Sequence, residues 1–277
     1  MTQLLPILGL VLALSPILLD LGAHFAAQPW ARYALVFVPL CLFALMRTQP
    51  RPARALDGYL WIALALCAEF AAIGGGTDRI GRLALPLAVI GACRAFGLAP
   101  LRHALVAVWL VPVPYALLTQ LGPRVHELMV ALTAPLLGAL GLEAAIQNGH
   151  LAGPGGDLAL NATNSGLTLA ALFSGLAWYT SVRAGHGSLG AARAALLGGL
   201  AAFPAQVVLF GIGAVTCALS APGVGSFFLQ PIVWSVVALL GIGCFELFKS
   251  PRAPRAFPFR EYALPDEIPG WEDEHGR

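Results

Sequence analysis

The chain has 277 residues, of which 58% are hydrophobic and only 11% are charged, and its formal net charge is +2. A soluble domain carries about 25% charged residues, so this composition excludes an ordinary soluble protein and predicts a polytopic membrane protein. A net charge this small gives no indication of nucleic-acid binding.

The first hundred residues predict four membrane-spanning helices. In chain order, the expected spans are Leu4–Phe25, Tyr33–Met46, Gly58–Ile73 and Leu83–Phe96. The first span has neither a basic region before it nor a small-residue cleavage site, so it is interpreted as a helix rather than a removed signal peptide. Asp20 and His24 lie four residues apart near its far end.

The middle of the chain is harder to assign. A fifth span runs from Arg102 to about Leu121 and contains two prolines. The following segment, Val125–Ala145, has an uninterrupted apolar core at Leu128–Leu142 that is broken by Pro135. This core is shorter than the roughly 17–25 residues that a spanning helix needs, so we expect an interfacial or re-entrant helix.

A glycine-rich linker, Ile146–Asp157, predicts a short hairpin or loop outside the bilayer. Three further spans follow, at Leu158–Ser181, Ala194–Val215 and Pro231–Phe248. The expected fold is therefore an all-α, polytopic helical bundle of about eight transmembrane helices plus one interfacial or re-entrant helix. Residues 1–248 form this transmembrane domain, with N-terminal helices in 1–100 and a core in 101–248. Residues 249–277 are expected to form a cytoplasmic, mostly disordered tail.

The distribution of basic residues predicts the orientation. With eight spans and both termini cytoplasmic, eleven basic residues lie inside and four outside, as the positive-inside rule requires. The inside set is Arg47, Arg51, Arg54, Arg94, Arg102, Arg183, Arg193, Lys249, Arg252, Arg255 and Arg260, and the outside set is Arg32, Arg79, Arg82 and Arg124. We therefore expect a multi-pass protein of a bacterial-type inner (plasma) membrane.

The opening of the sixth span is the best candidate site. Asn161, Asn164 and Thr168 follow one another at i, i+3 and i+7, so they share one helical face. Polar groups that enter a bilayer are costly unless a packed bundle or water satisfies them, so this face is expected to point inward. The alternative is an ordinary helix cap with polar contacts between packed helices.

The same topology gathers ionisable residues on the outer side, where they are either functional or parts of a solvated rim. They are Asp20, His24, Glu69, Asp78, Arg79, Arg82, Arg124, His126, Glu127, Glu143, His150 and Asp157.

The five cysteines show no spacing that predicts a metal site or a disulfide framework. They are Cys41, Cys67, Cys93, Cys217 and Cys244, mostly inside apolar segments. We interpret them as packing residues and expect neither a metal nor another cofactor.

The order of elements from Trp109 onward resembles the exosortase/archaeosortase family. A proline-containing helix end (WLVPVPYALL) is followed by LLGALGLEA, a polar hairpin with NGHL, and a helix that opens on A-T-N-S-G-L. Family members carry A-C-S-G-[IL] at that opening, with the cysteine as nucleophile. Ser165, Gly166 and Leu167 match this motif, but Asn164 stands at the cysteine position and Thr163 at the alanine position.

Two further family positions also differ. The segment LLGGLAAFPAQVVLFGIGAV resembles the family helix that carries an essential arginine after a proline. Pro204 matches, but no arginine occurs at the corresponding turn near Gly213. The outer turn that holds the family histidine corresponds to Ser226–Trp234, which has no histidine. The resemblance covers about half of the chain, from Trp109 to Phe248.

The resemblance therefore implies an exosortase-like membrane protein without the Cys/Arg/His catalytic set. The first hypothesis is a non-catalytic binding or scaffold subunit for a hydrophobic helix, a lipid or a membrane protein complex. Its groove would be lined by Asn161, Asn164, Ser165, Gly166, Thr168 and Gln206.

Two alternatives remain open. One is an active membrane transpeptidase or protease that processes C-terminal sorting signals, with Ser165 or Thr163 as nucleophile and His150 as base. The other is a small transporter, against which the lack of an internal repeat argues.

Overall fold

A computed structural model describes residues 4–46, 53–76, 78–139, 141, 145–147, 150–153, 156–159, 166–218, 233–234, 236–238 and 240–241. The chain clusters into two units, Met1–Val237 and Ala238–Arg277.

The described chain is predominantly helical. Its α-helices are α1 (Leu4–Ala13), α2 (Ser15–Ala27), α3 (Phe37–Met46), α4 (Ala55–Gly75), α5 (Asp78–Gly81), α6 (Ala84–Phe96), α7 (Leu101–Ala104), α8 (Tyr115–Ala139), α9 (Leu167–Arg183) and α10 (Ser188–Ala218). Two 3₁₀ segments, η1 (Pro29–Val36) and η2 (Leu105–Leu110), lead into α3 and follow α7. The helical membrane class expected from composition is confirmed.

Three described helices are long and apolar enough to cross a membrane: Pro29–Met46, Ala55–Gly75 and Ser188–Gly213. Two bent pairs, Leu5–Ala13 with Ser15–Ala27 and Leu101–Leu110 with Tyr115–Ala139, raise the number to as many as five if each is one span. The structure thus supports a multi-pass protein, while the expected count of eight spans is not confirmed.

The first bend has a local cause. Its two arms, α1 and α2, meet at an angle of 55°. Pro16 follows directly and has no N–H to give to the carbonyl of Leu12. The Ser15 hydroxyl donates to that carbonyl instead, at 2.8 Å. The bend therefore leaves no orphaned carbonyl at this position.

The second bend corrects the sequence interpretation. The chain breaks at Val111–Pro114, with 77° between the two arms, and α8 then runs without interruption through Pro123 and Pro135. A boundary near Leu121 and a separate helix at Val125–Ala145 were therefore wrong. Pro112 and Pro114 have no N–H group to donate at the break. The N–H of Val113, between them, donates to the Tyr33 hydroxyl at 2.9 Å. The re-entrant interpretation of this region stays a prediction.

The linker after α8 forms a small antiparallel sheet. Its strands are β1 (Ala145–Gln147), β2 (His150–Gly153) and β3 (Gly156–Ala159), in the order β1-β2-β3. His150 pairs with Gln147 and with Ala159. The short hairpin expected from the glycine-rich linker is thus part of a three-stranded meander, and β2 and β3 both contact α10.

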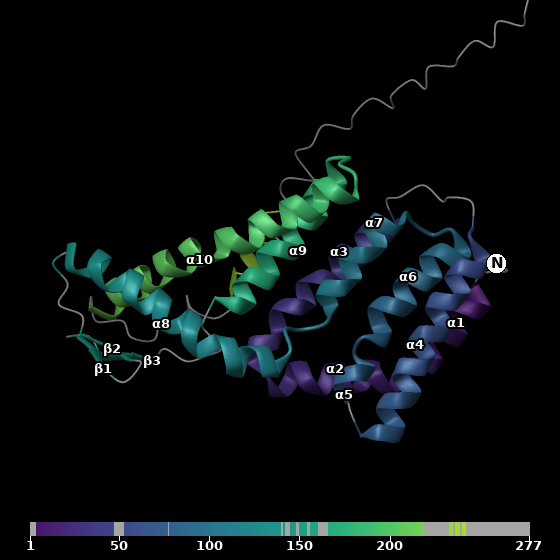
Figure 1. The fold of residues 1–277 in the computed structure, drawn as a ribbon, viewed down its shortest axis with the longest axis horizontal. Helices are drawn as coiled ribbons and strands as arrows, with labels where there is room; N and C mark the ends of the chain where they lie inside the picture. Colours follow the sequence, from purple (N-terminus) through teal and green to yellow (C-terminus); the bar gives the residue numbers. More distant parts are fainter. Residues whose placement is uncertain are drawn as a thin grey trace, which may run out of the picture. The chain divides into compact units, whose positions relative to one another are not determined.

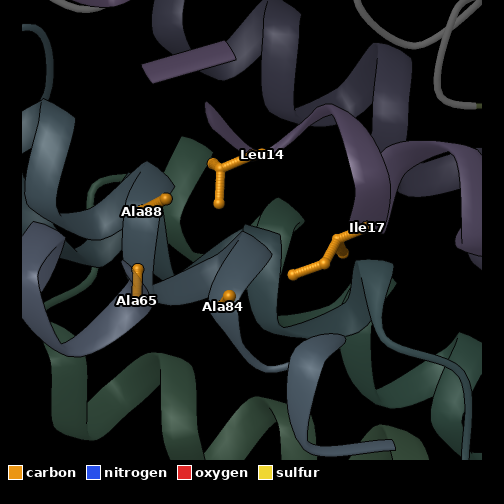
Figure 2. Close-up of a cluster of buried hydrophobic side chains, with 5 residues drawn as sticks. All are labelled: Leu14, Ile17, Ala65, Ala84 and Ala88. Carbon is orange, nitrogen blue, oxygen red and sulfur yellow. The ribbon is translucent and has the colours of Figure 1, made fainter. Parts of the chain in front are cut away.

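Two antiparallel helix pairs organise the unit, α4 with α6 and α9 with α10 (Figure 1). Small residues permit both approaches. A Cβ built at Gly91 would lie 2.7 Å from Ile62 Cγ1, and one at Gly198 would lie 2.7 Å from Ala177 Cβ. Figure 2 shows Leu14 and Ile17, from the α1–α2 bend, pointing toward Ala65, Ala84 and Ala88 of the first pair.

Candidate functional site

The candidate site lies where α8, α9 and α10 meet. These helices bury four polar side chains: His126 and Thr133 of α8, Thr168 of α9 and Gln206 of α10. On α8 the two polar residues belong to one buried stripe with Leu118, Gly122, Met129 and Leu137. The steps of three and four residues place this stripe on the helical face that meets α10 and α9.

Gly166 fixes the start of α9. It caps the helix with φ of +87°, a left-handed conformation that glycine adopts at little cost. A Cβ at this position would lie 3.4 Å from Gln206 Cγ and 3.6 Å from Phe203 Cδ1. The amino end of α9 is therefore packed against the middle of α10, with the Gln206 side chain beside it.

His126 lies against the same part of α10. Its ring meets Phe210 edge-on, with centroids 6.2 Å apart, and Phe210 is one helical turn beyond Gln206. Both ring nitrogens of His126 are buried and have no hydrogen-bond partner among the described residues. We call Gly166, Thr168, Gln206, His126 and Phe210 the Gln206 cluster.

The structure brings together only part of the set expected from sequence. Gly166, Thr168 and Gln206 lie in this cluster, and α10 packs alongside α9 as the sequence argument required. Asn161, Thr163, Asn164 and Ser165 lie outside the described residues. His150 is described only as a backbone position on β2.

His126 was predicted to be one of the ionisable residues of the outer side, either functional or part of a solvated rim. In the sequence it lies four residues after Gly122 and seven before Thr133. That spacing follows the buried stripe of α8, so helical periodicity was the available signal. A histidine on such a stripe becomes part of the bundle interior.

The ionisable residues near the α2 terminus form a second polar group. Arg82 Nε bonds Asp20 Oδ2 at 3.0 Å, and the His24 ring meets Trp30 edge-on at 5.5 Å. A cavity of about 300 Å³ is lined by His24, Arg82, Trp30 and the break before α8. Because Arg82 is already paired with a carboxylate, this group has the features of a structural rim as much as those of a site.

Glu69 also lies among the buried positions. It is 4% exposed on α4, and its Oε1 has no hydrogen-bond partner within the described part of the chain. It shares a buried helical face with Ala65 and Ala72, which faces the neighbouring helices.

Three of the cysteines, Cys41, Cys67 and Cys93, have a described side-chain environment. Cys41 and Cys93 are buried and Cys67 is exposed, and Cys67 lies on α4, in the other helix pair from the Gln206 cluster. No group of three or more histidine, cysteine, aspartate or glutamate side chains that could hold a metal ion occurs among the described residues. The cluster can form hydrogen bonds through the amide of Gln206, the hydroxyl of Thr168 and the imidazole of His126.

No protein-family profile, characterised protein or solved structure matches this chain. The resemblance to exosortases therefore stays a prediction from the quoted motifs.

Proposed function

We propose that this protein is an exosortase-like, non-catalytic membrane subunit that binds an apolar helix of another membrane protein beside the Gln206 cluster. The observation that carries the proposal is the contact of Gln206 with Gly166 at the amino end of α9. Gln206 follows Pro204 by two residues, in the helix whose relatives carry their arginine after a proline. An uncharged amide thus lies beside Gly166, which matches the glycine of the A-C-S-G-[IL] motif.

This difference matters for the chemistry. A cysteine transpeptidase needs a cation or a strong donor near its nucleophile to lower the thiol pKa or to stabilise an oxyanion. A glutamine amide is neutral and cannot act as an acid or a base at ordinary pH. It can accept and donate hydrogen bonds in a water-poor site, which is the property that a polar group on a bound helix would use.

The bundle is proposed to have eight spans, with both termini on the cytoplasmic side of a bacterial-type inner membrane. The eleven-to-four division of basic residues supports this orientation. A reporter fused after Gly155 is expected outside and one fused after Gly187 inside. Reporters that register on the same side would refute the proposed topology.

Site-specific photocrosslinking in native membranes tests the binding function. A photoreactive phenylalanine replaces Phe203, which is half-buried and lies against Gly166, and the matched control replaces Leu196, an exposed residue seven positions earlier on the same helix. We expect the Phe203 probe to capture a transmembrane segment of one protein at high yield and the Leu196 probe to capture lipid. Adding Gln206→Leu should lower the Phe203 yield about fivefold or more.

The captured protein also separates the two classes of function. An intact partner in equal amounts with this chain supports a scaffold. A partner cleaved near a C-terminal sorting signal supports the enzyme that would use Ser165 or Thr163 with His150. Capture of lipid alone from both positions would refute protein binding at this cluster.

A further inference from the structure

A second pocket lies at the far end of the other helix pair. It has a volume of about 470 Å³ and lies where α4 begins, α6 ends and α7 begins. Its polar side chains are Arg54 and Arg94, and its other lining residues include Ala99, Pro100 and Leu101. An apolar floor with two guanidinium groups at its edge is therefore built from three separate segments.

The two arginines are held next to each other by the backbone. The N–H of Arg54 donates to the carbonyl of Arg94 at 2.9 Å, which joins the residue before α4 to the last turn of α6. Like charges placed together repel each other unless an anion lies between or beside them. The pairing of these two chain segments thus favours a negatively charged group nearby.

One carboxylate neutralises part of this positive charge. Asp57, in the first turn of α4, is bonded by Arg94 Nη2 and does not line the pocket. The Nε of Arg94 is buried without a hydrogen-bond partner in the described chain, and the Arg54 side chain is exposed at the pocket. Two cations against one carboxylate leave a net positive charge facing the cavity.

We propose that this pocket binds the phosphate group of an anionic ligand, held between Arg54 and Arg94. Guanidinium groups bind phosphate through paired, charge-assisted hydrogen bonds. Both arginines belong to the set that the topology places inside, where basic pockets between membrane helices bind lipid head groups. The phosphate can come from an anionic lipid or from a soluble phosphate, and the two sources differ in whether acyl chains are required.

Native mass spectrometry of the delipidated, full-length protein in detergent tests the site. The protein is titrated with phosphatidylglycerol, with phosphatidylcholine, and with phosphatidylglycerol in the presence of inorganic phosphate. For a lipid site we expect one tightly bound phosphatidylglycerol, weaker binding of phosphatidylcholine and no competition by inorganic phosphate. For a soluble phosphate, inorganic phosphate competes and raises the melting temperature of the protein.

Three variants assign the binding to the pocket. Arg54→Gln should weaken phosphatidylglycerol binding about fivefold, the effect expected for one basic residue near an anionic head group. Arg193→Gln is the matched control, because Arg193 is exposed and predicted to lie on the same side of the membrane, and it should leave binding unchanged. Asp57→Asn should strengthen binding, since it removes the carboxylate that competes for Arg94.

The melting temperature of each variant is measured alongside, so that loss of folding is not mistaken for loss of binding. Arg54→Gln that folds normally and binds phosphatidylglycerol like the unmodified protein would overturn the proposal. So would equal binding of phosphatidylglycerol and phosphatidylcholine without any effect of inorganic phosphate. None of these measurements depends on the partner proposed for the Gln206 cluster.

Discussion

The α4–α6 pair and the α9–α10 pair solve the same packing problem and differ in where they put their polar groups. Each brings two helices together through glycine and alanine, at Gly91 in one pair and Gly198 in the other. In α4–α6, Arg94 and Asp57 pair with each other at the end of the helices. In α9–α10, Thr168 and Gln206 are buried, and α8 adds His126 beside them.

This difference separates two uses of polarity in a membrane bundle. A charge pair at a helix end lies near the interface, where water and head groups help to satisfy it. Buried polar groups in the bundle need protein partners, and His126 has none among the described residues. Glu69 of α4 is also buried, with its Oε1 unpartnered among the described residues, so the α8–α10 region differs in gathering several buried polar side chains from three helices. We therefore look for recognition of a membrane helix at the α8–α10 region and for recognition of an anion at the charged end of the α4–α6 pair.

The largest expected effect tests the shared feature, close packing. Gly91→Ala places a Cβ 2.7 Å from Ile62 Cγ1 and 2.9 Å from the Ile62 backbone nitrogen, so the helices must move apart. We expect a loss of about 1–3 kcal/mol in stability. Gly198→Ala should cost a similar amount, because its Cβ would meet the Phe173 carbonyl oxygen at 2.7 Å.

Thermal unfolding of the purified protein in detergent measures both changes. Gly74→Ala is the control, since nothing lies within 4 Å of its added Cβ. An unchanged melting temperature for Gly91→Ala would show that the α4–α6 pair is looser than the structure indicates.

The next effect concerns the charge pair at the end of α4–α6. Asp57→Ala leaves the Arg94 guanidinium without its carboxylate, and we expect a loss of about 1 kcal/mol or less, because the Arg94 and Asp57 side chains remain 18% and 43% exposed. The double variant Asp57→Arg with Arg94→Asp should recover part of the loss. Melting temperatures at low and high salt provide the measurement, and a loss that does not shrink in high salt would argue against an ion pair.

These two predictions rest on parts of the fold that the sequence located well. Apolar runs predicted helices at Gly58–Ile73 and Leu83–Phe96, and the structure has them at Ala55–Gly75 and Ala84–Phe96. The break before α8 could not be located in the same way. Several prolines occur in that region, and the break lies at Pro112 and Pro114, where the Val113 N–H donates to the hydroxyl of Tyr33, 80 residues away in the chain.

The candidate site shows the same division. Helical spacing and the polar opening of α9 predicted Thr168 and Gln206 as parts of one region, and both are buried there. The spacing of His126 along α8 indicated that it is buried, but it gave no sign of the partner, Phe210 on another helix, 84 residues later in the chain. Contacts between distant segments, which carry no local signal, decided both cases.

A modest effect is also expected inside the Gln206 cluster. Gln206→Leu keeps the side-chain volume near Gly166 but removes the amide, and a hydrogen bond of this kind contributes about 0.6–2 kcal/mol in a membrane protein. The control is Thr133→Val on α8, because among the described residues the Thr133 hydroxyl donates to the Met129 carbonyl of its own helix, at 2.7 Å. The unfolding midpoint and the crosslinking yield at Phe203 are measured together. Equal effects of the two substitutions would remove the reason to single out Gln206.

The smallest expected effect is none at all. Asn164→Cys introduces the cysteine of the A-C-S-G-[IL] motif that this segment resembles, two residues before Gly166. A thiol becomes a useful nucleophile only when a neighbouring cation or base lowers its pKa, and a donor must stabilise the oxyanion. The described residue packed against the start of α9 is the neutral Gln206, and no arginine follows Pro204 where the family helix carries one.

We therefore expect the Asn164→Cys protein, incubated in membranes with a substrate that bears a C-terminal sorting signal, to leave that substrate intact. The unmodified protein serves as the baseline, and the combined variant Asn164→Cys with Gln206→Arg asks whether a cation beside Gly166 is what the site lacks. Cleavage by the single variant above baseline would mean that the supporting groups are already present and that the site is catalytic. Cleavage by the combined variant alone would place the missing function at position 206, on the helix face that already touches the start of α9.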